Sequence, residues 1–168
     1  KEVIDSLPSL KMIVTRSTGT DHIDTSYCKQ KNIIVCNVPE YGTHTVAEHT
    51  FALLLSLSRK LVPSIERTRR GDFSLEGLRG FDLFGKTIGV IGVGNIGKSV
   101  IRIANGFGMD VIAYARHPDM ELAHALHFVY VDLDHLLTTS DIVTLHVPYT
   151  KETHHMINKA NLARFKKG

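Results

Sequence analysis

The sequence KTIGVIGVGNIG at residues 86–97 decides the fold. A short β-branched apolar run at residues 87–91 is followed by Gly92, Gly94 and Gly97, which have the spacing G-x-G-x-x-G. Apolar residues then recur with the period of a helix. Because the order is strand, glycine turn and helix, this motif predicts a dinucleotide-binding site in which the pyrophosphate lies at the N-terminus of the helix.

Each glycine has a separate role in such a motif. Gly92 allows the tight turn, Gly94 lets the backbone approach the phosphates without a Cβ in the way, and Gly97 lets the helix pack closely on the strand. The helix dipole and the free N–H groups then attract the phosphate charge. The alternative is a plain joint between a strand and a helix, because glycines also occur in ordinary turns.

The end of the next expected strand, residues 111–114, bears on the choice of cofactor. About 20 residues past the glycines, NAD-binding folds usually place an Asp or Glu that binds the ribose. Ala115 holds that position here and is followed by Arg116. Since no carboxylate would repel a 2′-phosphate and Arg116 can pair with one, the sequence predicts that NADP is accepted as well as NAD. The alternative is that Arg116 is a solvated loop residue and that one ribose contact is lost.

Composition sets the broad class of the protein. The chain has 168 residues, of which 43% are hydrophobic and 22% charged, and its formal charge of +3 is too small to indicate nucleic-acid binding. Its two cysteines and ten histidines have no metal-ligand spacing. No signal peptide or membrane span is apparent, so we expect a cytoplasmic protein without a metal. Because the chain begins without Met and ends at a helix-stop signal, we interpret it as an internal fragment of a longer protein.

The first forty residues have a strand–helix–strand pattern. Apolar, β-branched runs at residues 10–15 and 33–38 flank a polar helical stretch at residues 24–30. The small-residue loop at residues 15–20 follows the first strand, where open α/β sheets bind ligands. This loop is therefore a candidate anion site built from backbone N–H groups, or else an ordinary capped turn.

A loop rich in turn residues, residues 39–43, predicts a boundary between two lobes. Residues 45–61 then predict one helix with little polar face. A helix that is hydrophobic nearly all round must be buried. Burial within one molecule is one interpretation, and a homodimer interface through this helix is the interpretation that we favour.

The last third of the chain continues the alternation of strands and helices. A short strand is expected at residues 128–131, a helix at residues 133–137 and a fully buried strand at residues 141–147. This alternation predicts the α/β class with a doubly wound parallel sheet. The loop after the last strand lies at the strand ends near the cofactor. The candidate neighbours of the nicotinamide ribose are Val147, Pro148 and Thr153.

Four sequence stretches together resemble one family, the D-isomer-specific 2-hydroxyacid dehydrogenases. They are TRSTGTDHID (15–24), NVPEYGTHTVAEHTFALLL (37–55), FSLEGLRGFDLFGKTIGVIGVGNIG (73–97) and LHVPYTKETHHMIN (145–158). The resemblance spans essentially the whole chain, and residues 73–97 are most similar to the D-lactate dehydrogenase branch. Four motifs in the right order are far more specific than the glycines alone.

The resemblance implies an enzyme with two lobes. Residues 1–39 would be part of a flavodoxin-like substrate domain, and residues 40–168 an incomplete Rossmann domain that binds NAD(P). By analogy, backbone N–H groups of Thr18 and Gly19 would bind the carboxylate of the substrate, and Tyr41 would border it.

By the same analogy, Asn95 and Ile96 would lie at the pyrophosphate. Ala115 departs from the family, which usually has Asp there, and this departure leaves both NAD and NADP open. A small-molecule 2-oxo or 2-hydroxy acid would be the partner, and neither nucleic acid nor a membrane would be.

The reaction implied by the resemblance moves a hydride between NAD(P)H and a 2-oxo acid to give a D-2-hydroxy acid, with pyruvate and D-lactate or a close relative as the pair. In the family an Arg polarises the 2-oxo group, and a His paired with a carboxylate acts as acid or base. Those three residues follow the end of this chain, so no catalytic residue is assigned, and the isolated chain is expected to be inactive. A dinucleotide-sensing, corepressor-like binding protein and a gene remnant are the alternatives.

Overall fold

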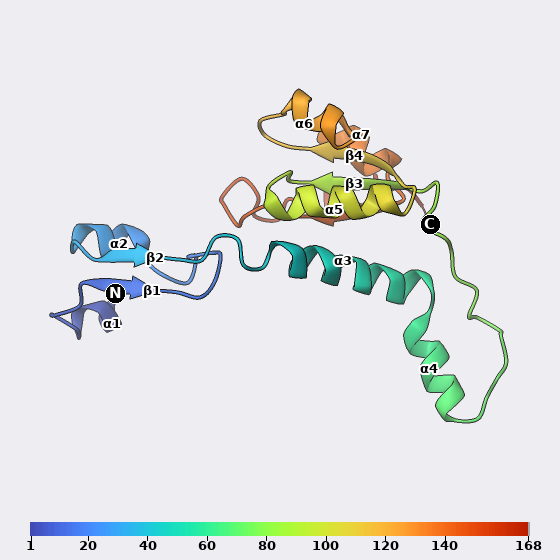
Figure 1. Cartoon of the computed structure of the whole chain (residues 1–168), viewed down its shortest axis with the longest axis horizontal. Helices are drawn as coiled ribbons and strands as arrows, with labels where there is room; N and C mark the ends of the chain where they lie inside the picture. The colour runs from blue at the N-terminus through green and yellow to red at the C-terminus, as the bar shows by residue number, and fades with distance from the viewer. Residues whose placement is uncertain (168) are drawn as a thin grey trace.

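The computed structural model describes residues 1–167, and its two parallel sheets are joined by a short linker (Figure 1). The smaller unit contains α1 (Glu2–Asp5), β1 (Met12–Val14), α2 (Thr25–Gln30) and β2 (Ile34–Cys36). The strands β1 and β2 pair in parallel. The side chain of Asp24 accepts a hydrogen bond from the N–H of Tyr27 and so fixes the start of α2. The predicted strand–helix–strand pattern is confirmed, although both strands are shorter than expected.

The larger unit is an α/β sheet whose four strands are all parallel, in the order β5-β4-β3-β6. Its elements are α3 (Thr43–Ser58), α4 (Leu61–Arg69), β3 (Thr87–Ile91), α5 (Asn95–Gly106), β4 (Asp110–Tyr114), α6 (Met120–Ala125), β5 (Val129–Tyr130), α7 (Leu133–Thr139), β6 (Ile142–Leu145) and α8 (Lys159–Leu162). The sheet separates two hydrophobic clusters, one containing residues of α5 and the other residues of α7. The predicted parallel sheet is confirmed.

The order of the strands places a topological switch beside β3. The chain runs outward from β3 through β4 to β5, and α7 then returns it to β6 on the other side of β3. The loops that follow β3 and β6 therefore leave neighbouring strands at the same edge of the sheet. Open α/β sheets bind ligands in the crevice at such a point.

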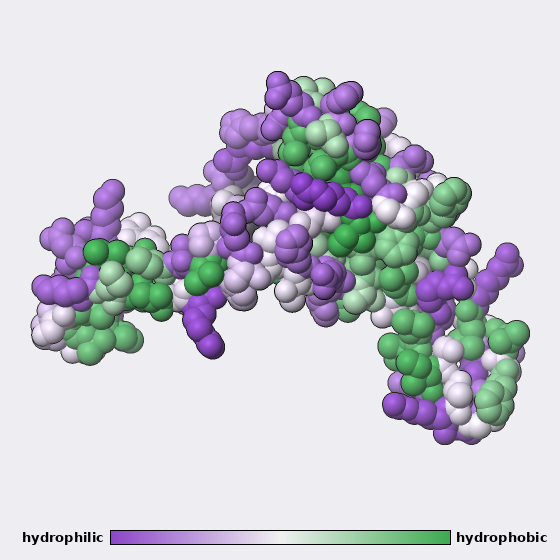
Figure 2. Space-filling model, in the orientation of Figure 1, coloured by the Kyte–Doolittle hydropathy of each residue, from purple (hydrophilic) through white to green (hydrophobic). Residues whose placement is uncertain are grey.

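The prediction of one helix over residues 45–61 is wrong at its C-terminal end. The helix α3 ends at Ser58, Lys60 adopts a left-handed backbone with φ of 54°, and α4 begins at Leu61 in a new direction (Figure 1). Burial of this helix within one molecule is also wrong, since Leu53 is 54% and Leu57 71% exposed. The physical reason is that α3 packs against α5 on one side only, so the apolar side chains of its other side remain on the surface (Figure 2).

The strand predicted as fully buried at residues 141–147 is shorter and less buried than expected. The strand β6 covers Ile142–Leu145, its first three residues are half-buried, and Leu145 is exposed. Among the described residues β6 pairs only with β3 and is thus an edge strand. An edge strand leaves one side uncovered, which explains the difference.

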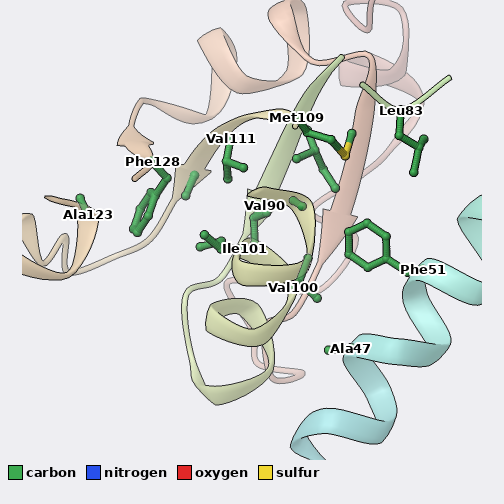
Figure 3. Packing of buried hydrophobic residues seen from close by; sticks show 13 residues of the cluster. Ala47, Phe51, Leu83, Val90, Val100, Ile101, Met109, Val111, Ala123 and Phe128 are labelled. Carbon is green, nitrogen blue, oxygen red and sulfur yellow. The ribbon is translucent and has the colours of Figure 1, made fainter. Parts of the chain in front are cut away.

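The main hydrophobic core lies between α3, α5, α6 and the sheet (Figure 3). Val90 from β3 and Val100 from α5 have no exposed surface. Phe51 of α3 is 4% exposed and its ring stacks on Phe107 with centroids 5.4 Å apart. Full burial of a side chain of this size contributes about 2–3 kcal/mol, so this core fixes α3 on α5.

The helix α5 lies unusually close to the end of β3. A Cβ built on Gly97 would collide with the carbonyl oxygen of Gly92. At its other end α5 ends at Gly106 with Phe107 as its C-cap, and Gly108 has a left-handed backbone with φ of 67°. The predicted tight packing at Gly97 is confirmed.

We expect Gly97→Ala to destabilise the protein by about 3 kcal/mol, because the obstacle is backbone that moves only if α5 moves away from β3. Gly106→Ala is the matched control, since a Cβ on Gly106 in the same helix meets nothing within 4 Å. The control is expected to raise stability by about 0.5–1 kcal/mol through the unfolded chain. Urea unfolding of both variants measures the difference, and equal effects would contradict the packing argument.

Candidate functional site

The glycine turn after β3 has the backbone geometry that its sequence predicts. Gly92 is left-handed, with φ of 95°, and a Cβ there would lie 2.6 Å from the carbonyl oxygen of His146. Gly94 is exposed, and a Cβ built on it meets nothing within 4 Å. Gly92 is therefore required by close packing, whereas Gly94 faces open space that a ligand can occupy.

The N-terminus of α5 offers hydrogen-bond donors to that space. Gly94 is the N-cap and provides no side-chain cap. The N–H groups of Asn95, Ile96 and Gly97 lie in the first turn, where a helix has no carbonyl partners for them. Uncapped N–H groups, the helix dipole and the open side of Gly94 fit the pyrophosphate of a dinucleotide.

One cavity of about 390 Å³ connects this helix terminus with the smaller unit. It is lined by Thr18, Pro39, Tyr41, Gly42, Thr43, Val46, Gly94, Asn95, Ile96 and His146. The cavity thus brings two of the predicted substrate residues together with three of the predicted pyrophosphate residues. Gly19, the third predicted substrate residue, is adjacent in sequence but does not line it. A second cavity, lined by Arg16, Ser17, Val38 and Tyr41, shares Tyr41 with the first.

The loop after β1 is held against the linker by side-chain hydrogen bonds. The Asn37 amide donates to the Thr18 carbonyl oxygen over 2.6 Å, and the Thr18 hydroxyl donates to the Val38 carbonyl oxygen over 3.3 Å. Neither the Thr18 nor the Gly19 N–H donates a hydrogen bond to any residue in 1–167. These two N–H groups are therefore available to an anion.

The end of β4 contains an ion pair that sequence reasoning missed. Ala115 is half-buried, and the exposed guanidinium of Arg116 lies 3.8 Å from the carboxylate of Glu152. Glu152 belongs to the loop after β6. The sequence indicates this ion pair only if the loops after β4 and β6 are known to lie at the same carboxyl edge of the sheet.

The loop after β6 contains the remaining candidates. Val147 packs with the cluster around Ile91, and Pro148 is exposed. The hydroxyl of Thr153 donates to the carbonyl oxygen of Pro148 over 2.6 Å. Thr153 thereby shapes its own loop, and its place beside a nicotinamide ribose stays a prediction.

His146 is a further residue of the site to which the sequence analysis assigns no role. His146 lines the main cavity, and its Nε2 is hydrogen-bonded with the hydroxyl of Thr144 over 2.9 Å. Burial lowers the pKa of His146, because the charged ring loses hydration. His146 therefore presents a neutral, half-buried ring to the cavity near neutral pH.

Within residues 1–167, no three His, Cys, Asp or Glu side chains come together as metal ligands. No helix in the same range combines the length and the apolar character needed to cross a lipid bilayer. A parallel sheet with a glycine turn, a close helix and an open helix N-terminus at the switch point defines a dinucleotide-binding domain.

Comparison with known proteins identifies the family. Residues 51–168 match the family model described as the NAD binding domain of D-isomer specific 2-hydroxyacid dehydrogenases. The chain belongs to the D-isomer-specific 2-hydroxyacid dehydrogenase family, as the sequence motifs predicted.

The similarity to individual relatives extends along nearly the whole chain. A 2-hydroxyacid dehydrogenase homolog of Zymomonas mobilis is 46% identical over 99% of this chain and 51% of its own length. The structure of D-lactate dehydrogenase from Aquifex aeolicus, complexed with NAD and lactic acid, matches 100% of this chain and 50% of that protein, with 44% identity and a TM-score of 0.92. An acyclic imino acid reductase in complex with NADPH and D-Arg matches 98% of this chain and 52% of that protein, with 34% identity and a TM-score of 0.87. The chain thus spans about half the length of the relatives that it matches.

The lowered pKa of His146 predicts a dependence of stability on pH. The unfolded chain binds a proton at His146 at about pH 6.5, whereas the folded chain does so only at a lower pH. As the pH falls through this interval the unfolded state binds more protons, so the free energy of unfolding decreases.

Between about pH 7 and pH 5, we expect the wild type to lose more stability than His146→Gln, which cannot gain the proton. Gln keeps a hydrogen-bonding group near Thr144, and the other histidines are common to both proteins and cancel. Chemical unfolding at the two pH values measures the difference. Equal losses in both proteins would show that His146 titrates normally.

Proposed function

We propose that this chain forms the cofactor-binding domain and an adjoining part of the substrate domain of an NAD(P)-dependent D-2-hydroxyacid dehydrogenase. The proposed reaction moves a hydride between the nicotinamide and a 2-oxo acid, with pyruvate and D-lactate or a close relative as the pair. The observation that carries the proposal is the single cavity that joins Thr18 and Tyr41 to Gly94, Asn95 and Ile96. A hydride moves only between groups in contact, so substrate and cofactor sites must meet.

The cofactor would be held chiefly by backbone groups. The N–H groups of Asn95 and Ile96 would bind the pyrophosphate, and Gly94 would let it approach. Arg116, beside Ala115, would accept a 2′-phosphate, so that both NAD and NADP are used. When bound, the cofactor supplies or accepts the hydride, and the residues named here orient it.

The substrate would be held at the loop after β1. The free N–H groups of Thr18 and Gly19 are suited to a carboxylate, and the bond from Asn37 keeps the loop in place. Tyr41 is 68% exposed, lines both cavities and would border the bound acid. These residues bind and position a 2-oxo acid, and we propose that the acid–base and polarising groups lie outside residues 1–168.

The test compares this chain with the full-length protein. The isolated chain should bind NADH, as followed by nicotinamide fluorescence, and should not oxidise it in the presence of pyruvate. The full-length protein should reduce pyruvate with NADH or NADPH. Binding without turnover by the full-length protein would favour a dinucleotide-sensing role, and turnover by the isolated chain would refute the location of the catalytic groups.

We also propose that two copies associate through α3 and through an arm, which consists of α4 and residues 70–76. The exposed side chains of α3 include Leu53 and Leu57, and those of the arm include Val62, Phe73 and Leu75. Arg67 orders the arm, because its guanidinium donates to the carbonyl oxygens of Ser74 and Glu76 over 2.9 and 2.7 Å. An ordered apolar surface of this kind is typical of an interface between subunits.

The variant Gly94→Asp separates cofactor binding from folding. Space around Gly94 is open and its backbone is extended, so Asp fits there and caps the helix at least as well as Gly. The added carboxylate would occupy the free N–H groups and repel the pyrophosphate, and we expect NADH binding to weaken more than tenfold. Gly106→Asp at the other end of α5 is the control and should bind NADH normally. Unchanged binding by Gly94→Asp would place the pyrophosphate elsewhere.

The variant Leu57→Asp tests the proposed dimer. Leu57 is 71% exposed, so a charge is tolerated in the monomer but would be buried and unpaired in the interface. We expect the dimer dissociation constant to rise about a hundredfold. Val3→Asp, at a residue 73% exposed on α1, is the matched control and should remain dimeric. Sedimentation velocity over a range of concentrations distinguishes the two, and a dimeric Leu57→Asp variant would exclude this surface.

A further inference from the structure

The ion pair between Arg116 and Glu152 bridges the end of the central strand. The strand β3 lies between β4 and β6, so the loops that carry Arg116 and Glu152 leave the sheet on opposite sides of the glycine turn. Because neighbouring strands are about 4.8 Å apart, the ends of β4 and β6 are separated by about 10 Å. The two side chains nevertheless meet, with Nη2 of Arg116 3.8 Å from Oε2 of Glu152.

The turn that carries Glu152 is closed by hydrogen bonds between Thr150 and Thr153. The Thr150 N–H donates to the Thr153 hydroxyl over 2.8 Å, and the Thr153 N–H donates to the Thr150 hydroxyl over 3.2 Å. The Thr150 side chain, a backbone N–H and the positive charge of Arg116 together hold the pKa of the Glu152 carboxyl below its ordinary value. Glu152 is therefore an ionised carboxylate on a hydrogen-bonded turn.

Carboxylates and phosphates compete for the same guanidinium. Each presents two acceptor oxygens that can pair with the two-pronged donor face of Arg. A phosphate at Arg116 would have to displace Glu152 or to lie beside its negative charge, which is unfavourable. The pair is exposed, with 65% and 70% of its two side chains accessible, so its displacement costs little. Such competition would weaken the binding of a phosphate to Arg116 without abolishing it.

We propose that Glu152 is a cofactor-specificity residue, which weakens the hold of Arg116 on the 2′-phosphate of NADP and so brings the affinities for NADH and NADPH closer together. This inference rests on the proposed function, since it requires that the adenosine ribose lie at the end of β4. NAD-binding folds usually have a carboxylate at the position of Ala115. In this chain the nearby carboxylate would instead be that of Glu152, in the loop after β6.

The test measures dissociation constants of NADH and NADPH for the full-length protein by equilibrium titration of nicotinamide fluorescence. In Glu152→Gln we expect NADPH to bind about two- to fivefold more tightly and NADH to bind as before, which is the size of effect of an exposed ion pair. Arg116→Gln should weaken NADPH selectively. In the Arg116→Gln background, Glu152→Gln should change nothing, because the group through which it acts is gone.

Glu2→Gln, on α1 and away from the end of β4, is the matched control for the change in net charge and should leave both constants unchanged (Figure 1). An unchanged ratio of the two constants in Glu152→Gln would overturn the inference. A full effect that persists in the Arg116→Gln background would also overturn it, since the carboxylate would then act on the ligand directly. If the wild type binds neither nucleotide, the proposed function fails instead, so the two failures are distinguishable.

Discussion

The contact between the first turn of α5 and the end of β3 determines where every other part of the site lies. Gly97 touches the carbonyl of Gly92, so the helix starts directly over the strand and its free N–H groups point past Gly94 into open space. The carbonyl of His146 approaches Gly92 from the other side and brings the loop after β6 to the same turn. Side chains at these two glycines would separate the strand, the helix and the neighbouring loop.

Local signals in the sequence predict the larger unit well because they are strong and need no distant partner. The run at residues 87–91 corresponds to β3, and Asp132 starts α7 by accepting a hydrogen bond from His135. The break between α3 and α4 has no such signal, since Lys60 is not a residue type that favours a left-handed backbone. The exposure of Leu57 likewise depends on which neighbours are near, and periodicity alone does not contain that information.

The candidate site could be predicted loop by loop but not as an assembly. Each candidate residue follows a strand, and parallel strands direct their carboxyl ends to one edge, which is why the cavity contains Thr18 and Asn95 together. Which loops face each other depends on the strand order β5-β4-β3-β6, and a single sequence does not fix that order. Glu152 and His146 were missed for this reason: both belong to the loop that returns beside β3 after the switch.

Affinity and specificity for the cofactor depend on physically different parts of this domain. Binding of the pyrophosphate would use backbone N–H groups whose position follows from close packing, so it cannot be changed without moving α5. The choice between NAD and NADP would depend on Ala115, Arg116 and Glu152, and the two charged side chains are exposed and make no packing contribution to the core. Substitutions at this pair therefore alter which dinucleotide is preferred while they leave unchanged the geometry that binds any dinucleotide.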